Sequence, residues 1–108
     1  MTRGEILIAV VSGDYGKPRP VVVVQSTHIM DTESWLVCPL TSRIDTVGPF
    51  RPRIDPSPQN GLTAPSAIMT EKLTAVPRFR IRSRIGALTA EELAALDASL
   101  MFVLGLGD

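Results

Sequence analysis

The chain has 108 residues, a length that fits a single domain spanning residues 1–108 around a thin core. With 44% hydrophobic and 20% charged side chains, the composition excludes a disordered tail, a collagen-like repeat and a disulfide scaffold. Eleven basic and eleven acidic residues cancel, but the charge is −1 over residues 1–40, +5 over 41–88 and −4 over 89–108. The basic middle suits a polyanionic ligand, and it also suits an ordinary solvated surface.

The first apolar segments are short. Ile6–Val11 and Val21–Val24 fall far below the roughly 20 residues of a membrane-spanning helix. Arg3 and Glu5 precede the first run, and no small-residue cleavage site follows, so no signal peptide is expected. A single cysteine, Cys38, cannot form an intrachain bridge and suits a reducing compartment. We therefore expect a cytoplasmic protein without membrane contact.

The first 85 residues predict short strands separated by turns. Ile6–Val11 and Val21–Val24 are unbroken apolar runs on either side of a loop rich in glycine and proline, residues 12–18. Ser34–Leu40 predicts a third strand. Phe50–Ile54 predicts a fourth, which Pro52 restricts to an edge or a bulge.

The next segments continue this pattern. Residues 55–61 form a loop, and Ala67–Ala75 predicts one or two more strands. Strands this short, interrupted by prolines, favour a mainly β protein built as a small barrel.

The end of the chain predicts a helix over about residues 89–104. Thr89 and Glu92 have the spacing of a capping box, and Gly105 is placed to end the helix. Leu93, Leu96 and Leu100, followed by Val103 or Leu104, fall on one stripe, which we expect to cover the barrel.

Metal chemistry finds no support in the sequence. His28 and Cys38 are the only residues of their types, and neither stands in a cluster with ligand spacing. No metal and no cofactor are therefore expected. The Gly13–Gly16 pair is also not followed by the lysine–serine pair and the helix that a nucleotide-binding loop requires.

Lys17-Pro18-Arg19-Pro20 is the most informative short segment. Prolines on both sides of Arg19 restrict the backbone, so its guanidinium projects from a stiffened segment. A planar guanidinium held in this way can grip a phosphate with two hydrogen bonds. The alternative is that the prolines only begin a strand and Arg19 pairs with a nearby acid.

A second cationic segment alternates with other side chains. Arg78, Arg80, Arg82 and Arg84 have the period of two that predicts one face of a strand. Such a face can attract a polynucleotide, and it can equally protect an edge strand from aggregation.

The order of several motifs resembles the MazF/PemK family of bacterial toxins. The matching segments, in chain order, are residues 3–6, 13–20, 21–26, 39–42, 60–62 with 65–66, 85–88 and 104–106. Each is weak alone, but together they cover nearly the whole chain. The resemblance implies an SH3-like β-barrel with a C-terminal helix, acting as a homodimer with a cognate antitoxin.

The same resemblance implies metal-independent cleavage of single-stranded RNA and names the site residues. The family's catalytic arginine and threonine correspond to Arg19 and Thr41, and its acidic positions to Asp14 and Glu71. Where many members have a Q-x-R-T run, this chain has residues 72–75 with the sequence Lys-Leu-Thr-Ala, so RNA contacts cannot be carried over there. The additional RNA-binding candidates are Lys17, Ser42, Lys72, Arg78 and Arg80.

The chemistry agrees with this assignment. In RNA the neighbouring 2′-hydroxyl is already positioned to attack the phosphate. We expect Arg19 to stabilise the phosphate charge and Thr41 to donate a hydrogen bond. Asp14 or Glu71 would accept the 2′-hydroxyl proton. Tyr15, Trp35 and Phe79 could stack a base, although Trp35 suits the core better.

Two alternatives remain open from the sequence. The chain also resembles CcdB, a toxin of the same fold that poisons DNA gyrase, in residues 24–26 and 29–32, 69–70 with 75–77, and 100–102. CcdB ends in a tryptophan-glycine-isoleucine stretch, whereas here Phe102 is followed by Val103. A catalytically silent SH3-like interaction module would keep the fold and tolerate the loss of Arg19.

Overall fold

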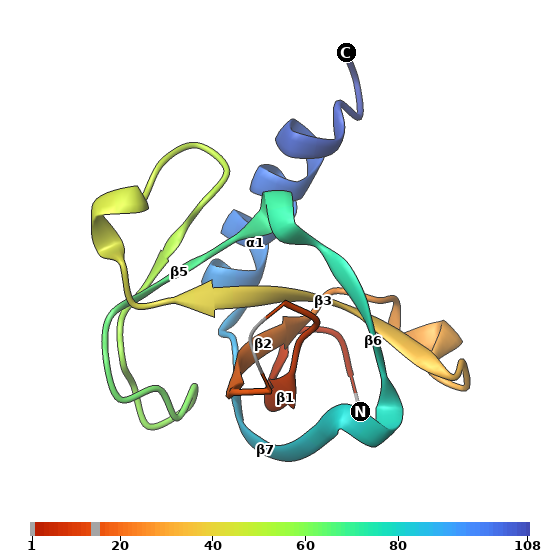
Figure 1. The fold of residues 1–108 in the computed structure, drawn as a ribbon. Coiled ribbons are helices and arrows are strands. Elements are labelled where there is room, and N and C mark those ends of the chain that lie inside the picture. The colour runs from red at the N-terminus through yellow and green to blue at the C-terminus, as the bar shows by residue number, and fades with distance from the viewer. Residues whose placement is uncertain (1, 14–15) are drawn as a thin grey trace.

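The computed structural model describes residues 2–13 and 16–108. An antiparallel sheet curls into a half-barrel, and one C-terminal helix lies against it (Figure 1). The strands are β1 (Glu5–Val10), β2 (Pro18–Val23), β3 (Ser34–Thr41), β4 (Arg53–Ile54), β5 (Ser66–Ile68), β6 (Thr74–Pro77) and β7 (Ile81–Ala87). The helix is α1 (Ala90–Leu104), and the short 3₁₀ helices are η1 (Thr27–Ile29), η2 (Ile44–Thr46), η3 (Thr70–Lys72) and η4 (Arg78–Arg80). The predicted mainly β fold with a C-terminal helix is confirmed.

Strand β3 is the centre of the sheet. The strands follow the order β4-β5-β3-β2-β1-β7, and β6 pairs with the first half of β3, at Ser34–Val37. The last residues of β3, Leu40 and Thr41, pair instead with β5. Because β3 changes partners along its length, the sheet bends around it, and β3 crosses the middle of the molecule (Figure 1).

The unbroken apolar run of β1 is explained by two hydrophobic cores. Neighbouring side chains of a strand point to opposite faces of the sheet. Ile6 packs with the cluster that includes Val22, whereas Leu7 and Ala9 pack with the cluster that includes Val21. Strand β1 is thus buried on both faces, which is why its sequence shows a run instead of an alternation.

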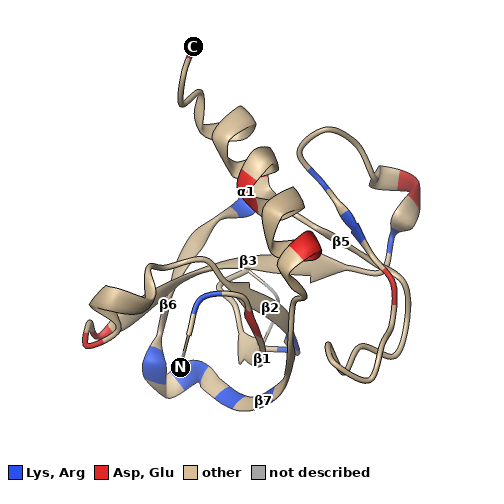
Figure 2. Cartoon of the chain, turned by 180° about the vertical axis from the view of Figure 1, so that it is seen from behind, with Lys and Arg blue, Asp and Glu red and all other residues tan. Residues whose placement is uncertain are grey.

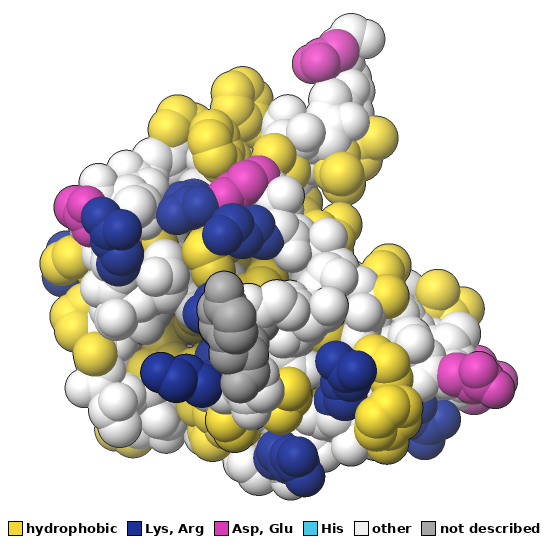
Figure 3. All heavy atoms as spheres, in the orientation of Figure 1, with side chains coloured by type: hydrophobic (Ala, Val, Ile, Leu, Met, Phe, Trp, Pro, Cys, Tyr) yellow, Lys and Arg dark blue, Asp and Glu magenta, His cyan; other side chains and the backbone are white. Residues whose placement is uncertain are grey.

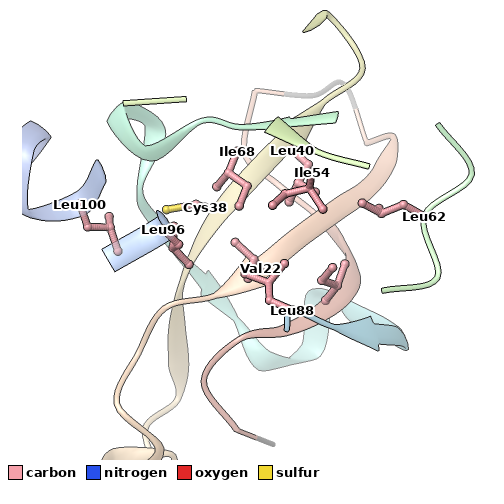
Figure 4. Close-up of a cluster of buried hydrophobic side chains, with 10 residues drawn as sticks. Val22, Cys38, Leu40, Ile54, Leu62, Ile68, Leu88, Leu96 and Leu100 are labelled. Atoms are coloured by element: carbon pink, nitrogen blue, oxygen red, sulfur yellow. The ribbon is translucent and has the colours of Figure 1, made fainter. Parts of the chain in front are cut away.

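The cluster under the helix closes one side of the half-barrel. Leu96 and Leu100 of α1 meet Cys38 and other side chains of the sheet, as Figure 4 shows. The part of the predicted stripe that covers the sheet is therefore Leu96 and Leu100. Leu104, the last candidate of that stripe, is exposed.

The capping box predicted for the helix is present. The Thr89 hydroxyl accepts a hydrogen bond from the Glu92 backbone N–H at 3.1 Å, and the Thr89 N–H donates to the Glu92 carboxylate at 2.8 Å. Gly105 ends the helix with φ 71°, a conformation that favours glycine.

A close approach between the loop at residues 59–61 and strand β7 explains the Asn60-Gly61 and Gly86 motifs. A Cβ on Gly86 would lie 2.4 Å from backbone atoms of Asn60, and one on Gly61 would lie 2.0 Å from the Ile85 carbonyl oxygen. The buried Asn60 side chain accepts from the backbone of Ser57 and Leu62. These contacts fix the loop that forms one wall of the site described below.

Two expectations for strands were wrong in part. Residues 78–84 do not form one strand: Arg78 and Arg80 lie in η4, and only Arg82 and Arg84 lie in β7. The register between β7 and β1 shifts at two places. The side chains of β7 therefore do not alternate regularly between the two faces of the sheet. The expected strand 50–54 is reduced to Arg53–Ile54.

Within the described ranges, no helix has the length and apolar character needed to cross a membrane.

Candidate functional site

Arg19 is placed by the start of β2. Its neighbours Pro18 and Pro20 belong to the same strand, and Arg19 pairs with Ala9 of β1. The residue is partly buried, so the sheet fixes its backbone while the guanidinium remains within reach of solvent. Arg19 therefore lies where a loop passes into a strand, as expected from the two prolines.

The register of the sheet brings Thr41 to Arg19. Strand β2 pairs with β3 through Val21 and Pro39, and continuing this antiparallel register by two residues sets Arg19 opposite Thr41. Side chains at opposed positions of an antiparallel pair lie on the same face. Two residues that are 22 positions apart in the sequence therefore share one surface.

This surface is the wall of a pocket of about 720 Å³. Arg19 and Thr41 both line it, between the β1–β2 loop on one side and the segment from η3 to β6 on the other. The other polar or charged side chains in the lining are Ser12, Arg43, Thr46, Arg51, Lys72 and Thr74. Among the described residues, the lining contains four cationic side chains and no carboxylate.

Arg19 and Thr41 also line a second pocket of about 570 Å³. Its far wall is the loop held by Asn60, with Leu62 and Thr63, and Ser42 contributes beside Thr41. The arginine and the threonine thus form a ridge between two depressions.

The Thr41 hydroxyl is oriented by the backbone that follows it. Its oxygen accepts a hydrogen bond from the Arg43 N–H at 3.2 Å. A hydroxyl has one proton to donate, and this contact leaves that proton for a ligand. Thr41 can therefore serve as a donor at the ridge.

Arg51 is held in the pocket by Glu71. The Arg51 Nε lies 3.0 Å and 3.1 Å from the two carboxylate oxygens of Glu71, and its Nη2 bonds to Oε2 as well. The hydrogen bonds from Arg51 lower the pKa of Glu71 despite its partial burial, and the same contacts raise the pKa of Arg51. Glu71 is ionised at neutral pH and fixes Arg51 in the lining.

Of the other predicted site residues, some line the two pockets and others do not. Ser42 lines the second pocket and Lys72 the first. Lys17 is exposed immediately before β2, outside the lining of both pockets. Asp14 lies outside the described residues, as does Tyr15.

Arg78 and Arg80 lie away from the ridge. Arg80 lines a third depression of about 560 Å³, whose residues Val11, Ser12 and Gly13 also line the first pocket. The Arg78 guanidinium lies over the Trp35 ring, 5.4 Å from its centroid. Trp35 itself is buried, and its Nε1 donates to the Met30 carbonyl, so the tryptophan belongs to the core as expected.

Arg43 and Arg51 were missed from the sequence. Arg51 stands in a segment where Arg53 has the same local pattern, yet Arg53 pairs with Asp55 instead of lining the pocket. Only the tertiary contact with Glu71, 20 residues away, distinguishes the two arginines. No signal in a single sequence could have found it.

The residues capable of metal or thiol chemistry are not gathered at the ridge. In residues 2–13 and 16–108 there is no group of three His, Cys, Asp or Glu side chains that could hold a metal ion. Cys38 is buried, and burial, followed by the charge of Glu71, raises its pKa to about 12. The thiol is therefore not a nucleophile at neutral pH.

Comparison with known proteins identifies relatives over the whole length. A sequence model of the PemK-like, MazF-like toxins of type II toxin–antitoxin systems matches residues 2–104. A protein of Mycolicibacterium smegmatis named "Probable endoribonuclease MazF" is 40% identical over 108 residues, covering 98% of each chain.

Solved structures of similar fold include two from mycobacteria. An endoribonuclease in complex with its cognate antitoxin, from a mycobacterial species, has a TM-score of 0.82 at 18% identity, covering 100% of this chain and 98% of that one. The Mycobacterium tuberculosis toxin MazF-mt6 has a TM-score of 0.82 at 23% identity, covering 96% and 99%. A MazE–MazF structure from Deinococcus radiodurans has a TM-score of 0.77 at 21% identity, covering 99% and 97%.

Proposed function

Because the chain belongs to the PemK-like, MazF-like toxins of type II toxin–antitoxin systems, we propose that the ridge formed by Arg19 and Thr41 is its catalytic centre. The chain is an endoribonuclease toxin of this family, and the gyrase-poison and silent-module alternatives find no support in its relatives. The observation that carries the proposal is that Arg19 and Thr41 line the same two pockets.

The substrate proposed for this site is single-stranded RNA. Its backbone would lie across a lining with four cationic side chains and no described carboxylate, which favours a polyanion. The 2′-oxygen attacks the adjacent phosphorus as its proton passes to a base, the bond from phosphorus to the 5′-oxygen breaks, and the leaving oxygen takes up a proton from water. The products are a 2′,3′-cyclic phosphate and a 5′-hydroxyl end, and no metal ion is needed in this scheme.

Arg19 and Thr41 act on the phosphate as negative charge accumulates. The guanidinium of Arg19 stabilises the non-bridging oxygens, and the Thr41 hydroxyl donates to one of them. Donors already held in place do not have to reorganise during the reaction. The β2–β3 register supplies this preorganisation.

The remaining requirement is a base for the 2′-hydroxyl proton. Glu71 was one predicted candidate, but its lowered pKa makes it a weak base, and its oxygens are engaged by Arg51. We assign Glu71 a positioning role through Arg51, whose charge faces the pocket. Asp14 is the remaining carboxylate candidate, and its assignment rests on the family resemblance alone.

Lys72, Ser42 and Lys17 extend the proposed contact with RNA. Lys72 lines the first pocket and Ser42 the second, so they stand on opposite sides of the ridge. Lys17 is exposed near the start of β2 and could reach a flanking phosphate. Together they would guide the strand across Arg19 and Thr41.

An antitoxin is the partner of a toxin of this family. We propose that it silences the chain by covering the cationic pocket with an acidic segment, since such a segment complements the lining. We also propose that the chain acts in the cytoplasm, where messenger RNA is translated.

We further propose a homodimer formed through the exposed end of α1. Met101, Phe102, Leu104 and Leu106 are exposed there, and Phe102 (63% exposed) stacks on Phe50 with ring centroids 6.4 Å apart. A contiguous apolar patch of this kind is typical of an interface. Leu73 lines both the cationic pocket and the apolar groove beside α1, so a second subunit would adjoin the catalytic pocket.

The proposed reaction is tested by incubating the purified protein with single-stranded RNA in EDTA and analysing the ends. We expect cleavage with a 2′,3′-cyclic phosphate and a 5′-hydroxyl. Cleavage that requires a divalent ion, or that leaves 5′-phosphate ends, would contradict the proposed chemistry.

A further inference from the structure

Three arginines around η4 differ from most others in the chain. Five arginines form ion pairs with carboxylates: Arg3 with Asp97, Arg43 with Asp45, Arg51 with Glu71, Arg53 with Asp55 and Arg84 with Glu5. Arg78, Arg80 and Arg82 form no ion pair within the part of the chain that the structure describes. No described carboxylate therefore holds these three guanidiniums. Figure 2 shows this concentration of basic residues from η4 along β7.

Phe79 projects from the middle of this cluster. It is 79% exposed, more than any other large hydrophobic side chain among the described residues. The Arg80 guanidinium lies 5.8 Å from the centroid of the Phe79 ring, so a cation flanks the ring. Phe79 also lines a depression of about 470 Å³ together with Arg78, Arg82 and Trp35. An aromatic ring set among guanidiniums offers a surface for a base beside contacts for its phosphates.

A continuous path links Phe79 to the catalytic pocket. The first pocket and the third depression share Val11, Ser12 and Gly13, and Arg80 lines the far side of that depression. From Arg80 the path reaches Phe79 and then the depression around Arg82. Lys and Arg side chains gather on this face over η3 and again over η4 and the start of β7 (Figure 3).

We propose that Phe79, with Arg78, Arg80 and Arg82, is a second RNA-binding subsite for the strand that leaves the catalytic pocket past Gly13. Phe79 stacks one base, and the arginines bind the flanking phosphates. This inference rests on the proposed function, since it places a distant part of the same substrate. RNA is favoured over an acidic peptide because the exposed ring gives a peptide carboxylate nothing to bind, whereas every base has a face that can stack.

The test compares KM for a long and a short RNA that contain the same cleaved sequence, of about sixteen and about four nucleotides. We expect Phe79→Ala to raise KM for the long RNA by about 5- to 150-fold, the range that corresponds to one lost stacking contact. The KM for the short RNA, which cannot reach η4, should be unchanged. Phe79→Trp keeps an aromatic face and should retain the wild-type KM. Phe79→Leu keeps only apolar volume and should behave like Phe79→Ala.

Two further variants complete the experiment. Arg82→Gln should reduce the dependence of log K on log salt by about 0.7 for the long RNA, as one lost phosphate contact on a single strand predicts. Ile29→Ala is the control. It truncates an exposed hydrophobic side chain on a different 3₁₀ helix, η1, and should leave both KM values unchanged.

The outcomes separate this inference from the proposed function. If the wild type cleaves neither RNA, the proposed function itself fails. If the wild type cleaves both, and Phe79→Ala or Phe79→Leu keeps the wild-type KM for the long RNA, the subsite is excluded. If Phe79→Ala weakens binding of the antitoxin but leaves both KM values unchanged, the surface belongs to the antitoxin and the inference is overturned.

Discussion

At the scale of single residues, the site depends on pairs that are distant in the sequence. Arg19 and Thr41 line the same two pockets, two residues beyond the Val21–Pro39 pair at which β2 and β3 meet. Arg51 enters the lining because Glu71 holds it. A slip of one residue between β2 and β3 would turn one of the two proposed catalytic side chains to the other face. The buried valines on both sides of β2 prevent such a slip, since it would exchange the contents of the two cores.

The pair Arg51–Glu71 predicts a pH-dependent contribution to stability. The pKa of Glu71 in the folded chain lies below its ordinary value of 4.5, so the ionised carboxylate stabilises the fold above that value. This contribution is lost as the pH falls through the lowered pKa. We expect Glu71→Gln to reduce the free energy of unfolding at pH 7 by about 1 kcal/mol or less, and by a smaller amount at acidic pH.

Urea denaturation of both proteins at neutral and acidic pH measures this difference. Glu33→Gln, which removes an exposed carboxylate, is the control and should show no such gap between the two conditions. A Glu71→Gln effect that is equally large at acidic pH would show that the charge of Glu71 is not its cause.

At the scale of elements, the helix was predicted best and the strands after β3 least well. The capping box, the glycine stop and the leucine stripe are local signals, and α1 occupies residues 90–104, close to the range predicted from the sequence. The arginines at residues 78–84 were wrongly predicted to lie on one strand. An arginine at every second position also occurs where a 3₁₀ turn is followed by a bulged strand, as it does here. Such a bulge depends on the pairing of β7 with β1, which no local pattern reveals.

In the candidate site, too, local features could be predicted from the sequence, whereas features that depend on tertiary contacts could not. Arg19 was recognisable because two prolines flank it in the sequence, whereas Thr41 was assigned only through the family resemblance. That they share one wall required the sheet register, and the entry of Arg43 and Arg51 required tertiary contacts. Family resemblance supplied the pairing of Arg19 with Thr41 before any geometry was available.

The helix cap gives a prediction at this scale. Thr89→Ala removes the acceptor for the Glu92 N–H, and we expect a loss of about 1 kcal/mol in the free energy of unfolding. For a domain of this size, such a loss lowers Tm by about 4–8 °C. Thermal unfolding followed by circular dichroism measures it. Thr89→Ser keeps the hydroxyl and should retain the wild-type Tm, and an equal drop in both variants would rule out the cap as the cause.

At the scale of the whole molecule, the two exposed surfaces have different characters. The face around the ridge and η4 is cationic, whereas the end of α1 is apolar and adjoins the cationic pocket through Leu73. A chain of this length has a thin core, and joining two copies would bury the apolar end and bring their cationic pockets near one another. The proposed dimer therefore links stability and substrate binding.

Phe102→Glu tests this arrangement. A carboxylate at the centre of the apolar end would be desolvated in the dimer, so we expect the variant to sediment as a monomer and to lose part of its RNA affinity. Phe79→Ala, which changes an aromatic residue on the other surface, should remain a dimer. A Phe102→Glu protein that keeps the mass of the wild type in solution would show that the interface lies elsewhere.

The most direct measurement is a double-mutant cycle on kcat/KM for single-stranded RNA, with Arg19→Ala, Thr41→Ala and the double variant, each confirmed as folded by circular dichroism. Both donors are assigned to one phosphate, so each single change should lower the rate by a factor of about 10²–10³. The double variant should lose much less than the product of the two factors, because the residues act as a unit. A folded Arg19→Ala protein with wild-type activity, or losses that multiply in full, would contradict a common site of action.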